Sequence, residues 1–219
     1  MRNLKLFYDT ETTGLPLFKE PSEHPDQPHI VQLAATLVDM GSRDVIASMD
    51  VIVRPDGWTI PDEVAAVHGI TTEHAATVGV PESLALSMFL ELWAGRPRVA
   101  HNEQFDARII RIAQHRAGEL ESELERWKSG ARECTALMAT PIVKCPPTAK
   151  MLAAGRNHYK TANLAEAVQF FTGKPLENAH SAMADVRGCM AVYFGIQDMR
   201  NGAPGALVDA EFMPSAEVA

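Results

Sequence analysis

The segment Leu4-Lys5-Leu6-Phe7-Tyr8-Asp9-Thr10-Glu11-Thr12-Thr13-Gly14-Leu15 begins as a short apolar strand and ends in a polar turn. Side chains two residues apart lie on the same face of a strand, so Asp9 and Glu11 point in the same direction. Two neighbouring carboxylates repel each other unless a cation lies between them. A single DxE pair is equally typical of a polar strand end that faces water, and both interpretations stay open at this point.

Two further segments place carboxylates near the start of an expected helix. His101-Asn102-Glu103-Gln104-Phe105-Asp106 follows a short buried strand and puts Asp106 one turn into a helix. His180-Ser181-Ala182-Met183-Ala184-Asp185 opens the last helix. Taken alone, each acid also fits an ordinary first-turn residue that the helix dipole favours. Together the three segments supply four carboxylates and a histidine, each at the margin of an expected element.

Composition limits the kind of protein that can carry these residues. The chain has 219 residues, 46% of them hydrophobic, which fits one globular domain. A net charge of −8 argues against nucleic-acid binding through a broad basic surface, but not against an enzyme that meets phosphates through bound cations. No apolar run approaches the roughly 20 residues of a membrane helix, so we expect no membrane association. Three cysteines without a CxxC pair suit a cytoplasmic protein.

The order of elements predicts an α/β fold, with strands first and then strands mixed with helices. Periodicity and turn signals predict strands at 4–9, 30–40, 44–53 and 98–100 and helices starting at Pro81 and over 102–116, 161–172 and 181–199. Residues 1–199 are expected to form one domain. Residues 200–219 contain no Lys or Arg after Arg200 and are expected to be a mobile tail.

The order and internal spacing of the three acidic segments resemble the DnaQ-like 3′→5′ exonucleases of the DEDDh group. In that family a DxE segment, often followed by TTG and Leu, precedes an HN-x-x-FD segment and an H-x4-D segment. Ser181 stands where the related DEDDy group has tyrosine, so the histidine version fits. Val67-His68-Gly69-Ile70-Thr71 and Asn163-Leu164-Ala165 add further matches. The resemblance covers residues 4–197 and implies a ribonuclease H-like fold, a mixed five-stranded sheet with helices on both sides.

The resemblance also implies the site. Two Mg²⁺ ions, for which Mn²⁺ could substitute, would be held by Asp9, Glu11, Asp106 and Asp185, and His180 would act as general base. Asp9 would bridge the two ions. Substrate contacts would come from Thr12, Thr13, Leu15, His68, Asn102 and Phe105, with Leu15 wedged against the last base. Core packing is the alternative for Leu15 and Phe105, and an ordinary loop position is the alternative for His68.

The expected activity is metal-dependent 3′→5′ hydrolysis of single-stranded nucleic acid with a free 3′ end, DNA being favoured, with release of nucleoside 5′-monophosphates. An exoribonuclease of the ribonuclease T or oligoribonuclease type is the first alternative, and contacts to the 2′-OH would distinguish it. A proofreading subunit docked on a DNA polymerase is the second. A non-catalytic module on the same fold is disfavoured, because it should have lost at least one of the five motif residues.

Two longer segments bear on how the substrate enters. The loop from Pro16 to Pro28 leaves directly from the first acidic segment and could shape the entrance. Residues 134–165 contain no Asp or Glu but hold Lys144, Lys150, Arg156 and Lys160. This stretch could steer a phosphate backbone toward the site, or it could be a solvated loop with scattered cations.

Overall fold

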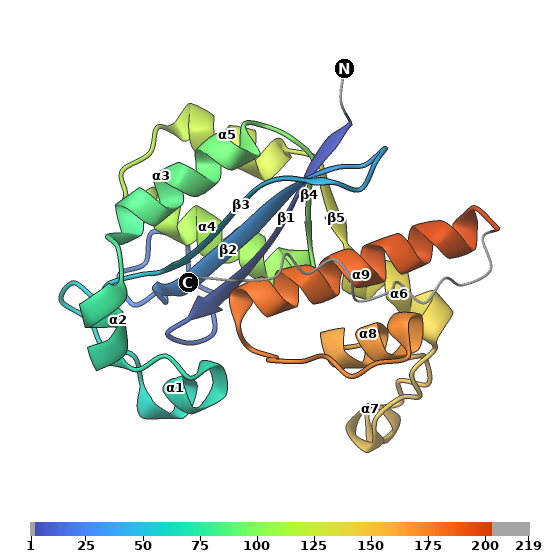
Figure 1. The fold of residues 1–219 in the computed structure, drawn as a ribbon. Coiled ribbons are helices and arrows are strands. Elements are labelled where there is room, and N and C mark those ends of the chain that lie inside the picture. Colours follow the sequence, from blue (N-terminus) through green and yellow to red (C-terminus); the bar gives the residue numbers. More distant parts are fainter. Residues whose placement is uncertain (1–2, 203–219) are drawn as a thin grey trace, which may run out of the picture.

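A computed structural model describes residues 3–202. Its centre is a five-stranded sheet with the strand order β3-β2-β1-β4-β5 (Figure 1). The strands are β1 (Leu4–Thr12), β2 (Ile30–Asp39), β3 (Val45–Ile52), β4 (Arg98–Ala100) and β5 (Arg132–Cys134). β1, β2 and β3 pair antiparallel, whereas β1, β4 and β5 pair parallel. The predicted mixed five-stranded sheet is therefore confirmed.

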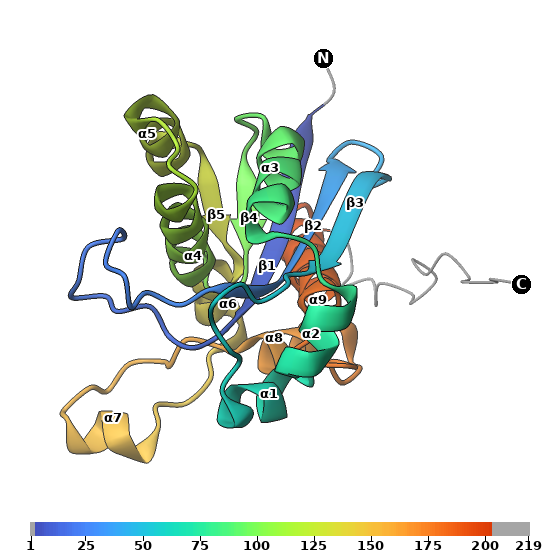
Figure 2. The same cartoon turned by 90° about the vertical axis from the view of Figure 1, so that its left-hand side faces the viewer.

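Helices cover both faces of this sheet (Figure 2). Along the chain they are α1 (Asp62–His68), α2 (Thr72–Val78), α3 (Glu82–Trp93), α4 (Glu103–Arg116), α5 (Glu121–Ser129), α6 (Thr135–Val143), α7 (Ala149–Ala153), α8 (Leu164–Thr172) and α9 (Ala182–Arg200). α3 and α4 pack on one face of the sheet, and α9 packs on the other. α6 and α8 then pack against α9.

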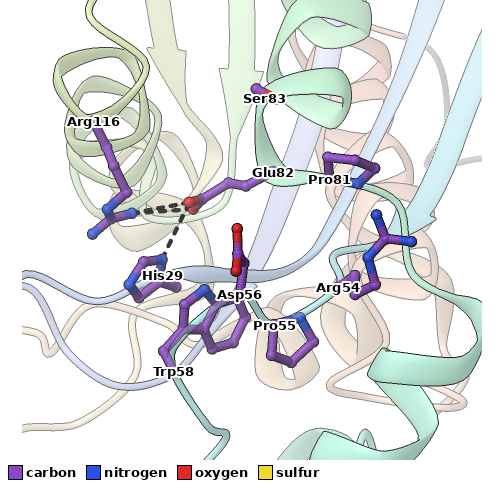
Figure 3. A pocket seen from close by; sticks show the side chains of 9 residues that line it. All are labelled: His29, Arg54, Pro55, Asp56, Trp58, Pro81, Glu82, Ser83 and Arg116. Atoms are coloured by element: carbon purple, nitrogen blue, oxygen red, sulfur yellow. Dashed lines mark hydrogen bonds and ion pairs between the residues drawn. The ribbon is translucent and has the colours of Figure 1, made fainter.

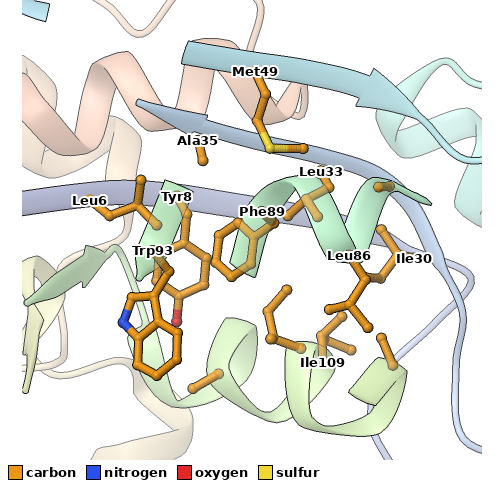
Figure 4. Packing of buried hydrophobic residues seen from close by; sticks show 14 of the residues in the cluster. Leu6, Tyr8, Ile30, Leu33, Ala35, Met49, Leu86, Phe89, Trp93 and Ile109 are labelled. Carbon is orange, nitrogen blue, oxygen red and sulfur yellow. The ribbon is translucent and has the colours of Figure 1, made fainter. Parts of the chain in front are cut away.

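Alternation along β1 assigns its side chains to the two faces. Leu6 and Tyr8 are buried against Phe89 and Trp93 of α3 (Figure 4). Phe7 points the other way and packs against α9. Because a strand repeats every two residues, Asp9 and Glu11 share the α9 face of the sheet with Phe7, whereas Thr10 faces α4. The fold thus aims the DxE pair at the helix that carries Asp185.

The shortness of β4 exposes one edge of β1 near the acidic residues. β4 pairs with β1 only at Leu6 and Phe7. On the opposite edge β2 follows β1 as far as Thr12. Beyond Phe7, backbone groups on the β4 side of β1 can therefore bond to side chains instead of to a strand.

Most of the expected elements are present, with small shifts at their ends. β1 extends three residues past the expected strand, and α8 begins at Leu164 instead of 161. The later start of α8 follows from Asn163, whose side chain accepts from the Glu166 N–H in a capping box. The elements α1, α2, α5, α6, α7 and β5 were not predicted.

The expected tail lies outside the described residues from 203 onward, and its mobility stays a prediction. The last described element, α9, ends at Arg200. Within residues 3–202, no helix has the length and apolar character needed to cross a membrane.

Candidate active site

The first part of the site forms where β1 faces the start of α9. Asp9 and Glu11 lie half-buried near the end of β1, and Asp185 lies half-buried in the first turn of α9. The Ala182 N–H donates to Gln32 Oε1 on β2 across 3.1 Å. This bond ties the first residue of α9 to the sheet, so Asp185 is held beside the DxE pair.

Asp106 reaches the same place from the opposite face of the sheet. It lies in the first turn of α4 and is buried. Its Oδ1 accepts two hydrogen bonds from Thr10, one from the backbone N–H at 3.0 Å and one from the hydroxyl at 2.8 Å. Thr10 lies on the β1 edge that β4 leaves open. These two bonds link α4 to β1 through the Asp106 carboxylate.

The crowding of these carboxylates perturbs their protonation. Burial raises the pKa of Asp9 well above its usual range, and repulsion from Asp106, Asp185 and Glu11 adds to the rise. Burial followed by repulsion from Asp185 and Asp106 raises the pKa of Glu11 to about 8. Burial also raises the pKa of Asp106 to about 8, although the hydrogen bonds from Thr10 oppose it. All four carboxylates are therefore close enough to feel one another's charge.

A divalent cation fits this donor set. Ligand atoms of Glu11, His180 and Asp185 all lie within 4.8 Å of one another. Asp185 Oδ1 is buried and has no hydrogen-bond partner among the described residues, which is costly unless a cation or proton binds there. Carboxylate oxygens are the ligands that Mg²⁺ prefers. His180 is exposed, and its backbone has φ 66°, a left-handed conformation that turns the chain sharply before α9.

Comparison with known proteins agrees with this geometry. The model of the exonuclease family (RNase_T) matches residues 6–193. The chain belongs to this exonuclease family. The DnaQ-like resemblance drawn from the acidic segments is thereby confirmed, and the chain contains an exonuclease domain. No curated protein sequence matches the chain.

Solved structures support the fold of the exonuclease domain. E. coli exonuclease I in complex with a dT13 oligonucleotide superimposes with a TM-score of 0.68 at 21% identity, over 92% of this chain and 43% of that one. The zinc-bound E. coli exonuclease I–ssDNA complex gives 0.65 at 19% identity, over 94% and 42%. A product-bound exonuclease I gives 0.68 at 19%, over 92% and 45%. The chain thus spans less than half the length of the exonuclease I chains it matches.

The turn after β1 carries three of the expected substrate contacts. Leu15 is 77% exposed, so it is not a core residue. Thr12 is buried, and its hydroxyl donates to the Gly14 carbonyl across 2.7 Å. Thr13 is half-buried, and its hydroxyl accepts from the His29 N–H. Leu15 is therefore the freest of the three to meet a ligand.

The other expected substrate contacts come from α1 and the start of α4. His68 is buried at the end of α1, and its Nδ1 accepts from the Ile70 N–H, while Nε2 has no partner among the described residues. Burial and the nearby charge of His180 lower the pKa of His68, which places it next to the site. Asn102 is exposed in a left-handed conformation and makes no cap bond. Phe105 is half-buried against the core, so it serves packing at least in part.

A hollow of about 420 Å³ is lined by His29, Trp58, Glu82 and Arg116, among others (Figure 3). Here Glu82 accepts from the Ile30 N–H, from Arg116 and from His29, whose ring stacks on Trp58 with 4.5 Å between centroids. Burial would raise the pKa of Glu82, but these hydrogen bonds and the Arg116 charge lower it. The backbone carbonyl of His29 accepts from the Thr13 N–H at 3.0 Å. The contacts of Glu82 and Trp58 with His29 therefore stabilise the turn after β1, to which His29 is bonded.

Sequence analysis assigned no positioning role to three residues that anchor the segments of the site. Thr10 holds Asp106, and Gln32 holds the start of α9. His101 Nε2 donates to the Ala162 carbonyl at 3.1 Å, and its Nδ1 lies 3.0 Å from Thr135 Oγ1. Only the position of Thr10 could have been recognised from the sequence. Because Thr10 lies between Asp9 and Glu11 on one strand, its side chain must point to the opposite face of the sheet, toward the helix that packs there.

The metal-free domain should lose stability as pH rises. Glu11 and Asp106 have folded-state pKa values of about 8, above the value of about 4 expected in the unfolded chain. The folded state therefore binds more protons between pH 4 and 8, and its stability falls over this window. We expect the melting temperature in EDTA to drop between pH 5 and pH 8.5, and Mg²⁺ or Mn²⁺ to restore it at the upper end.

The control for this prediction is Glu11→Gln, which removes one of the titrating groups. Its melting temperature in EDTA should fall less steeply over the same pH range, and the metal should stabilise it less. A wild-type melting temperature that stays level or rises from pH 5 to pH 8.5 in EDTA would contradict the assignment.

Proposed function

We propose that this chain is a metal-dependent 3′→5′ exonuclease that shortens single-stranded DNA and releases nucleoside 5′-monophosphates. The proposed catalytic domain comprises residues 1–199. One observation carries the proposal: four carboxylates from three distant segments converge at the end of β1, with His180 beside two of them.

The proposed roles follow from where each side chain lies. Divalent ions bound between these carboxylates, two Mg²⁺ in this proposal, would activate a water and stabilise the leaving oxygen of the phosphodiester. Asp9, whose pKa responds to all three other carboxylates, is the natural bridging ligand. Glu11 and Asp185 would bind the ion on one side of the site. Asp106, which Thr10 holds in place, would bind the ion on the other side.

His180 is proposed as the general base that takes the proton from the attacking water. It is exposed to solvent, and one of its ring nitrogens lies within 4.8 Å of a carboxylate oxygen of both Glu11 and Asp185. The neutral imidazole of a histidine is the commonest general base in enzymes. The same distance would let His180 ligate a metal, so the proposal needs a test that separates the two roles.

Single-stranded DNA is the proposed substrate class. The structurally similar E. coli exonuclease I was solved in complex with dT13 and dA16 oligonucleotides. In this chain the exposed side chain of Leu15 follows directly on the segment that holds Asp9 and Glu11. A protruding apolar side chain next to the reacting bond can wedge against the terminal base, and this explains how a 3′ end would be gripped.

Dependence on a free 3′ end tests this proposal. We expect a linear 5′-labelled single strand to give a ladder of products with Mg²⁺, a 3′-phosphorylated strand to be degraded far more slowly, and a circular strand to survive. Matched DNA and RNA oligomers in the same assay report the sugar preference. Cleavage of circles at rates comparable with linear strands would identify an endonuclease and overturn the proposal.

A further inference from the structure

Residues 146–159 form a segment, the arm, that projects from the body of the domain. Its neck is closed by the Lys160 N–H, which donates to the Cys145 carbonyl across 3.1 Å. All residues of the arm are exposed except Pro147 and Met151, which are half-buried, and α7 within it has no buried residue. Core packing therefore does not explain why the chain forms the arm.

The arm differs in charge from the rest of the protein. The acid-free stretch 134–165 contributes four cations to a chain whose net charge is −8. Lys160 is neutralised by an ion pair with Glu166 at the neck. Among the described residues, Lys150 and Arg156 in the arm have no side-chain partner, and both are exposed. These two cations are free to meet an anionic ligand, which the acidic remainder of the surface would repel.

The neck of the arm is attached to the catalytic segments. His101 donates to the Ala162 carbonyl, two residues beyond the neck, and His101 lies immediately before Asn102 and α4, which carries Asp106. In two perpendicular views α7 projects beyond the end of the sheet at which β1 ends (Figures 1 and 2). A strand whose 3′ end lies against Asp9 can reach the arm if it leaves the domain across this end.

We propose that the arm binds the phosphate backbone of single-stranded nucleic acid several nucleotides away from the 3′ end. This inference rests on the proposed function and adds a second contact region to it. Lys150 and Arg156 pair with phosphates, and the exposed side chain of Tyr159 offers an aromatic face on which a base can stack. Long strands then bind more tightly than short ones, whereas the chemistry at Asp9 is the same for both.

Binding in EDTA tests the arm without hydrolysis. We expect Lys150→Gln/Arg156→Gln to raise the Kd for a fluorescent dT20 about tenfold at ~50 mM salt. The slope of log affinity against log salt should fall by about 1.4, because each lost phosphate contact on a single strand removes ~0.7. The melting temperature should not change, since neither side chain is packed or paired among the described residues.

The matched control is Lys128→Gln/Arg200→Gln, which removes the same charge elsewhere. Lys128 is exposed on α5, and Arg200 ends α9, about 22 Å along the helix from Asp185 at 1.5 Å per residue. The control should bind dT20 like the wild type. If both double variants weaken binding equally, only the net charge matters and the arm is not a binding element. If the arm variant binds dT20 like the wild type, the proposal is overturned.

Hydrolysis assays distinguish a failure of the arm proposal from a failure of the proposed nuclease function. The p-nitrophenyl ester of thymidine 5′-monophosphate is too small to reach the arm, so the arm variant should hydrolyse it at the wild-type rate. On dT20 the arm variant should show a KM raised about tenfold with kcat kept. A wild-type protein that hydrolyses neither substrate would refute the nuclease function, whereas an active wild type with an unaffected arm variant would refute the arm alone.

Discussion

Replacing Asp9 by alanine abolishes hydrolysis in the mechanism proposed here and leaves the domain folded. Asp9 is the carboxylate whose pKa responds to Glu11, Asp106 and Asp185 together, so its loss removes the ligand shared by both halves of the site. Removing one of several repelling carboxylates should leave the metal-free protein as stable as the wild type, or more so. Single-turnover degradation of a labelled oligomer with Mg²⁺ measures the loss.

Thermal unfolding with and without metal provides the control for Asp9. The alanine variant should melt in EDTA at or above the wild-type temperature, and Mg²⁺ should raise that temperature far less than it does in the wild type. Asp44 is a useful comparison, since it is exposed in the turn between β2 and β3, outside the carboxylate cluster. An Asp9→Ala variant that retains more than about a tenth of the rate, a barrier change below ~1.4 kcal/mol, would refute the bridging role.

His180→Ala should lower kcat by about 10²–10⁴-fold, the usual contribution of a positioned general base. Only a neutral imidazole can accept a proton, so a general base at position 180 makes the wild-type rate depend on pH. The variant should lose this part of the pH profile, although a metal-bound water can impose a pH dependence of its own. Measurements of kcat against pH at saturating metal and substrate compare the two proteins.

Metal affinity distinguishes a base from a ligand at position 180. If His180 acts as the base, Mn²⁺ titrations of the wild type and His180→Ala should give similar midpoints while the rates differ widely. His180→Gln keeps a polar side chain but cannot take up the proton at neutral pH, so it should be as slow as the alanine variant. A kcat within about threefold of the wild type would remove His180 from the mechanism, and a large shift in metal midpoint would make it a ligand.

The local sequence was enough to predict the type of fold and to propose the residues of the site. Strand periodicity is a local property, so the common direction of Asp9 and Glu11 could be read from the sequence and agrees with the faces of β1. The hairpin of β2 and β3, the strand before α4 and the long helix α9 also have clear local patterns. Short elements such as α1 and β5 have none and were missed.

The assembly of the site depended on contacts that no local pattern contains. Asp106 is held by Thr10, 96 residues away, and α9 is anchored through Gln32, 150 residues from Ala182. Both contacts require the complete sheet, and the first also requires that β4 end early enough to leave an edge of β1 open.

The raised pKa values of Asp9, Glu11 and Asp106 have the same origin, because burial and mutual repulsion exist only after the segments meet. Local spacing in the sequence was therefore enough to propose these carboxylates as metal ligands. Long-range packing buries these carboxylates close to one another, and a bound cation would then stabilise their like charges.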